Sequence, residues 1–179
     1  MRTVASDPGA EFTLQGVPNG DVFFTTSASG HWGMIDYYVV PKETGDDVYL
    51  GVIPEEEIAL YESELSRTIS DNDSIVVIVF YQGAQGGETG TISVGSDDPF
   101  TFDPDDPECL PELQPGIIVD QGGFGELIFT GVNPADGPIT ATVTGVAGVT
   151  DCEVDESQNT TYPLLAKSFT IIYAVCTAL

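Results

Sequence analysis

The sequence predicts an all-β fold: a jelly-roll-like sandwich or barrel of about 8–11 short strands with one short helix, forming a single domain over residues 1–179. Two observations lead to this prediction. Runs of β-branched and aromatic residues recur along the chain, and Gly, Pro, Asn or Asp bounds each run. Hydrophobic residues make up 41% of the 179 residues, which is enough for a domain-sized core.

Eleven runs have the length and composition of strands. The run at 74–82, SIVVIVFYQ, is continuously apolar, so we expect a central strand covered on both faces, with 168–175 as its companion. The Asn19-Gly20 pair predicts a tight hairpin turn, and VNPADGPI at 132–139 predicts a hairpin with a longer loop. The predicted strands are 11–17, 21–27, 34–41, 47–53, 74–82, 89–95, 116–121, 125–132, 138–146, 150–156 and 168–175.

One helix is predicted at about 55–67. Pro54 is suited to the first turn, and the three glutamates that follow it are favoured by the helix dipole. Ile58, Tyr61 and Leu65 then form one apolar stripe at helical spacing. We expect this helix to lie against a sheet or at the end of a barrel.

The chain is strongly acidic. It has 29 Asp and Glu residues against four Lys and Arg, which gives a formal net charge of −25. Such a surface repels itself in dilute buffer, and molar salt shortens the screening length to about 3 Å, so we infer a salt-rich environment. The same charge argues against direct nucleic-acid binding, because no basic stripe is present to neutralise phosphates.

The acids are densest in a Pro/Asp-rich connection at about 97–116, which has seven carboxylates and no Lys or Arg. Its five prolines stiffen the segment and keep neighbouring acids from converging, so we interpret it as a solvated connection. The alternative is a weak site for Ca²⁺, Mg²⁺, Na⁺ or K⁺. Its ligands would be Asp103, Asp105, Asp106 and Glu108.

No catalytic residues and no bound cofactor are predicted, so we do not expect an enzyme. His31 is the single histidine, and no nucleophile motif lies near it in the sequence, so a structural or contact role is expected. Cys109, Cys152 and Cys176 are too widely spaced to suggest a zinc site. A Cys152–Cys176 disulfide is left open.

The ends of the sequence give no sign of a leader or a transmembrane segment. Met1-Arg2 runs directly into polar residues, and the apolar stretch at 168–179 is too short to cross a bilayer. At face value, the chain is made in the cytoplasm and stays soluble.

A family resemblance rests on the size of the chain, its acidity, the absence of a leader and the many short strands. It also rests on turns such as PNGD (18–21) and NPADG (133–137). In these features the chain resembles the small major capsid proteins of haloarchaeal, membrane-containing icosahedral viruses. The resemblance implies a single jelly roll that assembles with itself or with other coat proteins, resides in the virion and lies close to an internal viral membrane.

Subunit contacts are expected at aromatic and apolar residues, with the acids facing brine. The candidates are Trp32, Tyr37, Tyr38, Ile171 and Tyr173. Two alternatives are kept. One is a tail, turret or spike component of a halophilic virus, and the other is a carbohydrate-binding β-sandwich in which Trp32, Tyr37 and Tyr38 stack on sugars.

Overall fold

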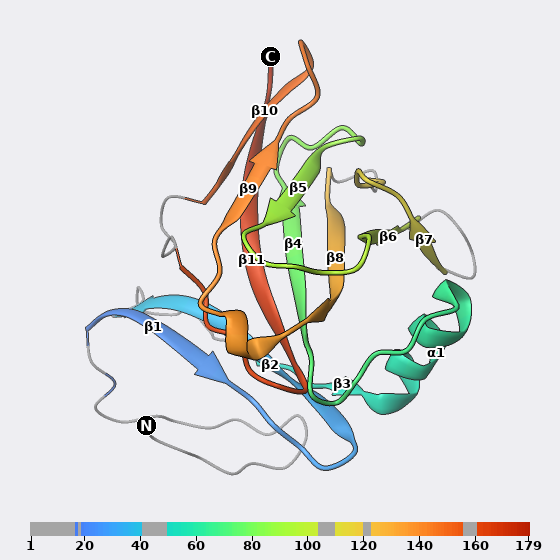
Figure 1. The fold of residues 1–179 in the computed structure, drawn as a ribbon. Helices are drawn as coiled ribbons and strands as arrows, with labels where there is room; N and C mark the ends of the chain where they lie inside the picture. Colours follow the sequence, from blue (N-terminus) through green and yellow to red (C-terminus); the bar gives the residue numbers. More distant parts are fainter. Residues whose placement is uncertain (1–16, 18, 41–49, 104–109, 120–122, 156–160) are drawn as a thin grey trace.

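The computed structural model describes residues 17, 19–40, 50–103, 110–119, 123–155 and 161–179. Within these ranges the chain forms eleven strands, one α-helix and one 3₁₀ helix (Figure 1). The elements are β1 (Gly20–Thr25), β2 (His31–Val40), β3 (Ile53–Pro54), α1 (Glu55–Leu65), β4 (Ser74–Tyr81), β5 (Thr89–Ile92), β6 (Phe100–Phe102), β7 (Pro111–Leu113), β8 (Gly125–Val132), η1 (Pro134–Asp136), β9 (Ala141–Thr144), β10 (Thr150–Val154) and β11 (Ser168–Ala178). The predicted all-β class with one short helix is confirmed.

Nine strands form one large mixed sheet. Its order is β1-β2-β11-β4-β8-β6-β7, with β3 paired to β2 and β10 paired to β11. The last strand, β11, runs parallel to β4 and, over three residues, parallel to β2. Neighbouring strands of a jelly roll run antiparallel. These two parallel pairings therefore distinguish the strand connectivity of this sandwich from that of a jelly roll.

The second sheet contains β5 and β9 alone and lies in front of β4 and β11 in Figure 1. Thr89 pairs with Thr144 and Ile92 with Ala141, which fixes the antiparallel register. The two sheets enclose the first hydrophobic core, in which alternate residues of β4 such as Ile78 meet Leu127 of β8 and Ile172 of β11. Alternation along each strand therefore directs one set of side chains between the sheets.

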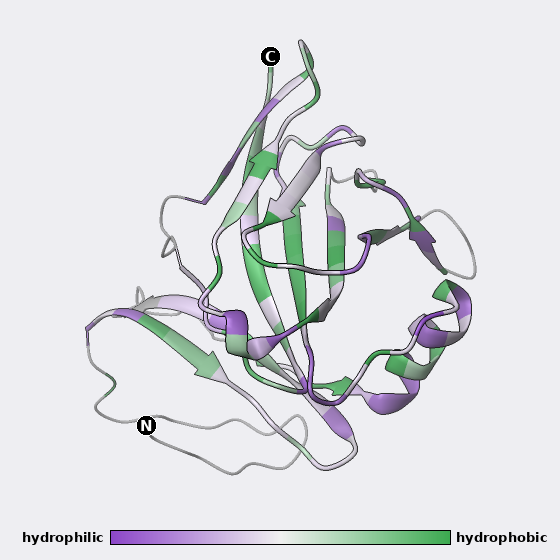
Figure 2. Ribbon diagram, viewed as in Figure 1, coloured by the Kyte–Doolittle hydropathy of each residue, from purple (hydrophilic) through white to green (hydrophobic). Residues whose placement is uncertain are grey.

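The opposite face of the large sheet forms a second core with α1. Ile75, Val77 and Val79 of β4 contribute to this core, together with the predicted helical stripe Ile58, Tyr61 and Leu65. Both faces of β4 are therefore buried, as the continuous apolar run predicted, and β11 is its neighbour. Figure 2 shows β4 as mainly hydrophobic, whereas α1 alternates between hydrophilic and hydrophobic positions.

The helix ends as its local sequence requires. Pro54 occupies the N-cap position, and Glu55, Glu56 and Glu57 fill the first turn. Ser66 adopts a left-handed conformation at the C-cap (φ 51°), where its N–H reaches the carbonyl of Ser63, so the helix ends two residues before the predicted limit. No helix among the described residues has the length and apolar character needed to cross a membrane.

Several element predictions need correction. The VNPADGPI segment does not close a hairpin, because η1 carries the chain from β8 in the large sheet to β9 in the small one. The 116–121 run contributes only a bridge from Gly116 to Thr89 in its described part, and the Pro/Asp-rich connection contains β6 and β7. Of the predicted strand 47–53, residues 47–49 lie outside the described part of the chain, residues 50–52 form no strand, and Ile53 begins β3. Residues 11–16 lie outside the described part of the chain.

Candidate functional site

The five predicted contact residues divide into two groups. Trp32, Tyr37 and Ile171 are only 1%, 7% and 8% exposed, because they pack inside the cores of this chain. They have no free surface for a neighbour or a sugar ring, so neither the contact role nor sugar stacking suits them. Tyr38 and Tyr173 are half-buried and keep part of their rings accessible.

Little of the predicted cation site can be placed. Asp105, Asp106 and Glu108 lie outside the described residues, and Asp103 is half-buried and engaged in an interaction of its own. Among the described residues, the group of His, Cys, Asp and Glu side chains with ligand atoms close enough for one ion is Glu88, Cys152 and Cys176.

His31 begins β2 beside a shallow surface depression that Pro54, Glu55 and Glu56 also line. Its Nδ1 lies 2.8 Å from the carbonyl oxygen of Ser29. This contact holds the ring against its own loop, in line with a structural role for His31.

A cluster of tyrosines and carboxylates occupies the region where β2 and β10 lie beside β11. Each of three tyrosine hydroxyls donates to an aspartate: Tyr37 to Asp21 at 2.8 Å, Tyr38 to Asp36 at 3.0 Å and Tyr81 to Asp155 at 2.6 Å. The Tyr81 ring also meets the Tyr173 ring edge to face at 6.2 Å. We call these residues, together with Tyr162, which interacts electrostatically with Tyr37 and Asp155, and Glu126, which interacts electrostatically with Tyr173, the tyrosine–carboxylate cluster.

Burial sets the acid–base behaviour of the cluster. It raises the pKa of Tyr37 to about 12, and the hydrogen bond to Asp21 adds to the effect. Burial also raises the pKa of Tyr173 to about 12, with the charges of Asp36 and Glu126 acting in the same direction. Neutral tyrosine hydroxyls of this kind donate hydrogen bonds at neutral pH, so the cluster is suited to holding strands together.

Glu126 of β8 lies on the helix side of the large sheet. Burial raises the pKa of its carboxyl group, and the nearby charge of Glu57 on α1 raises it further. Glu57 itself accepts a hydrogen bond from the hydroxyl of Tyr61. Two carboxylates therefore repel each other where the helix meets the sheet.

Both described basic side chains make tertiary contacts. Arg67 donates to the carbonyl of Asp98 and to the hydroxyl of Thr130, both at 3.0 Å, and lies 3.9 Å from the carboxylate of Asp97. Lys167 contacts Glu55 and, at 2.9 Å, Asp71. The acids that remain on the surface therefore have no described Lys or Arg partner.

Apolar side chains are exposed at both ends of the sandwich. Val149, in the turn between β9 and β10, is 43% exposed, and Leu165, shortly before β11, is 48% exposed. The carbonyl of Val149 accepts a hydrogen bond from Leu179 at the end of β11, which places this turn beside the far end of that strand. Leu60 of α1 and Leu113 of β7 are also exposed.

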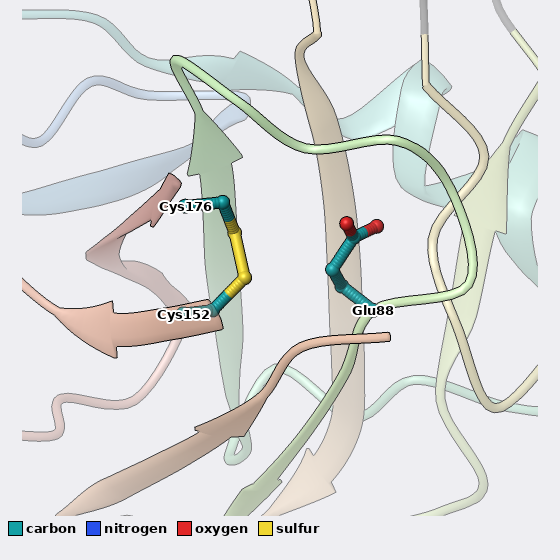
Figure 3. A group of neighbouring side chains, drawn as sticks. All are labelled: Glu88, Cys152 and Cys176. Carbon is teal, nitrogen blue, oxygen red and sulfur yellow. A yellow bond between two sulfur atoms is a disulfide. The ribbon is translucent and has the colours of Figure 1, made fainter. Parts of the chain in front are cut away.

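A disulfide joins Cys152 of β10 to Cys176 of β11 (Figure 3). The two residues are direct partners in the antiparallel ladder, with Cα atoms 4.2 Å apart. This resolves the pairing that the sequence left open. Cys109 lies outside the described residues.

Glu88 lies beside this disulfide and is fully buried (0% exposed). Its carboxylate accepts hydrogen bonds from the N–H groups of Gln85 and Gly86, both at 2.8 Å, and from the hydroxyl of Thr150 at 2.9 Å. The Thr150 hydroxyl in turn accepts from the N–H of Val146. The glycine-rich loop before β5 is thus folded around a carboxylate that also contacts the start of β10.

No sequence pattern singles out Glu88, which is one of 29 acids and is preceded by two glycines. Its burial depends on β10 and the 82–90 loop meeting in space, and no local pattern encodes that meeting.

No family model matches the chain, and no curated protein or solved structure is significantly similar to it.

Proposed function

We propose that this chain is a structural virion protein: a capsid subunit of a halophilic archaeal virus that assembles with itself or with related coat proteins into an icosahedral shell. The proposal rests on the exposed apolar residues and the acidic surface of the sandwich and does not depend on jelly-roll connectivity. Its location would be the virion, after synthesis in the host cytoplasm.

The observation that carries the proposal is the pair of exposed apolar residues at opposite ends of one strand. Val149 lies by the end of β11 and Leu165 by its beginning. A strand of eleven residues spans about 33 Å. Two different patches on one subunit can form head-to-tail contacts, and such contacts close into rings or shells when the rotation between subunits closes.

The charge distribution supports the same proposal. Within the described part of the chain, the basic side chains of Lys167 and Arg67 contact acids of the same chain, so the described surfaces of neighbouring subunits would meet acid against acid. Molar salt screens that repulsion and lets apolar and backbone contacts govern association. Assembly should therefore require salt.

The disulfide also fits a protein that works outside the cell. Disulfides persist in oxidising surroundings, including virion surfaces, and are rare in most cytosolic proteins. The bond between β10 and β11 fastens the strand whose two ends carry the proposed contacts.

The test is assembly at molar KCl, followed by light scattering and electron microscopy. We expect ordered closed particles or capsomers that dissociate when salt is lowered, before circular dichroism shows unfolding. Val149→Glu and Leu165→Glu should each reduce assembly, whereas Thr142→Glu, at an exposed position of β9, should not. A chain that stays monomeric at molar salt at all concentrations contradicts the proposal.

The same micrographs separate the rival functions. Rings or tubes of fixed diameter favour a tail, turret or spike component over a shell. Saturable binding on a glycan array by a chain that does not assemble favours a carbohydrate-binding module.

A further inference from the structure

We propose that Glu88, Cys152 and Cys176 form a metal site that opens when the disulfide is reduced, with Zn²⁺ as the natural occupant. The disulfide and the metal would then be alternative links between β10 and β11, one for oxidising and one for reducing surroundings. The inference is independent of the proposed capsid function.

The chemistry of the three side chains suits zinc. Two cysteine thiolates and a carboxylate are among the usual Zn²⁺ ligands, and three protein ligands leave the fourth tetrahedral position to water. The ligand atoms of Glu88, Cys152 and Cys176 lie within 4.8 Å of one another. Tetrahedral zinc needs about 3.7 Å between ligand atoms, so side-chain movements on the order of 1 Å would complete the site.

Glu88 is held in place before any metal arrives. Gln85 and Gly86 donate backbone N–H groups to it, and Thr150 donates its hydroxyl. Carboxylates that ligate metals are characteristically held by such outer hydrogen bonds, which fix the orientation of the ligand. Figure 3 shows the Glu88 side chain beside the disulfide between Cys152 and Cys176.

The charge of the site supports the same inference. Glu88 is fully buried, and within the described part of the chain no Lys, Arg or His side chain forms an ion pair with it. Buried charges in proteins are normally paired or coordinate a metal.

The redox step balances with an ordinary reductant. A phosphine and one water reduce the disulfide to two thiols and give the phosphine oxide. Zn²⁺ then binds as the two thiols lose their protons, so two protons are released for each metal bound. In the cell, a dithiol would supply the two electrons, and it would itself become a disulfide.

The experiment uses the full chain with Cys109→Ser, so that Cys152 and Cys176 are the only thiols. After reduction with a phosphine and removal of the reductant, Cd²⁺ is titrated under argon while thiolate-to-metal absorption is recorded, and Zn²⁺ is then added as a competitor. We expect one Cd²⁺ per reduced chain, displaced by Zn²⁺, two protons released per metal, and no stoichiometric binding by the oxidised chain.

Variants test the ligand set. Glu88→Gln should weaken binding at least tenfold, and Thr150→Val should weaken it by 10- to 100-fold through loss of the outer hydrogen bond. Glu153→Gln removes an exposed acid from the same strand and should leave binding unchanged. Melting of each oxidised variant establishes that it folds.

The proposal is overturned if the reduced chain binds no stoichiometric metal, or if Glu88→Gln binds as tightly as the parent. Should reduction alone unfold the chain, one equivalent of Zn²⁺ must restore a cooperative melting transition, and failure to do so also overturns it.

Discussion

Tyr81 of β4 donates a 2.6 Å hydrogen bond to the carboxylate of Asp155, which directly follows β10. The N–H of Asp155 donates to the carbonyl of Tyr173 on β11, the strand that lies between the other two. One aspartate therefore ties three strands of the large sheet together at the edge of the tyrosine–carboxylate cluster. The bond from β4 to Asp155 uses the hydroxyl of Tyr81, so this part of the connection depends on Tyr81 staying protonated.

We predict cooperative alkaline unfolding between pH about 10 and 12. In the unfolded chain a tyrosine has its ordinary pKa of 10.0, whereas in the folded chain Tyr37 and Tyr173 are raised to about 12. The folded state thus holds protons that the unfolded state releases, so this stability is complete below pH 10 and is lost as pH rises through 12.

The measurement is tyrosinate absorbance and circular dichroism recorded across the same pH range. Both signals should change together, because unfolding exposes the tyrosines. Tyr81→Phe should lower the free energy of unfolding by about 1 kcal/mol through loss of its hydrogen bond to Asp155. Gradual ionisation near pH 10 in a protein that stays folded argues against buried, hydrogen-bonded tyrosines.

Removing the disulfide should lower stability by about 3.5 kcal/mol. This is the loop-entropy value for cross-linked residues separated by 24 positions in the sequence. Denaturant unfolding of Cys152→Ser in a Cys109→Ser background, compared with Cys109→Ser alone in metal-free buffer, measures the difference. An unchanged unfolding midpoint means that Cys152 and Cys176 are not bonded in solution.

Stability should fall as KCl is lowered from molar concentrations to 0.1 M. The Debye length grows from about 3 Å to about 10 Å over this range, so repulsion among surface acids that have no described basic partner increases. Thermal melting at each salt concentration provides the measurement. A matched variant replaces four exposed acids with amides: Glu56, Glu64, Asp151 and Glu153. Its melting temperature should depend less on salt. If melting temperature changes with KCl concentration equally in the variant and the parent, the electrostatic explanation is contradicted.

The strongest features of the fold follow from local patterns. Apart from Ser74, the run 74–82 is apolar at every position that is buried in β4, and the stripe of Ile58, Tyr61 and Leu65 sets the buried side of α1. Burial on one side of an element leaves a periodic apolar pattern in its residues, and burial on both sides leaves a continuous apolar run. Both patterns are local, so these elements were predictable from sequence.

Features that depend on distant partners were not predictable. VNPADGPI has the composition of a hairpin loop, but β8 pairs with β4 and β9 pairs with β5, so the connection crosses between sheets. Trp32 and Tyr37 have the composition of a contact patch but are buried in the fold, where Phe169 packs against Trp32 and Phe23 against Tyr37. Glu88 is buried by a loop whose position is set by its backbone pairing with Gly116 and Ile117, which are also remote in sequence.

Glu126→Gln should stabilise the protein at neutral pH. Burial and the charge of Glu57 raise the pKa of Glu126 in the folded state, so folding favours the protonated form. The stability linked to that proton is complete below the ordinary pKa of 4.5 and is lost as pH rises through the raised value, which leaves the ionised group opposing folding at pH 7. A neutral amide of the same shape removes this opposition.

Unfolding of the parent and the variant is compared from pH 3.5 to 8 at constant ionic strength. The gain should be present at pH 7 and disappear below about pH 4.5, where the glutamate is protonated in both states. Glu112→Gln, an exposed acid on β7, serves as the control and should show no such dependence. A gain that is the same at every pH would show that packing, and not the charge of Glu126, accounts for the difference.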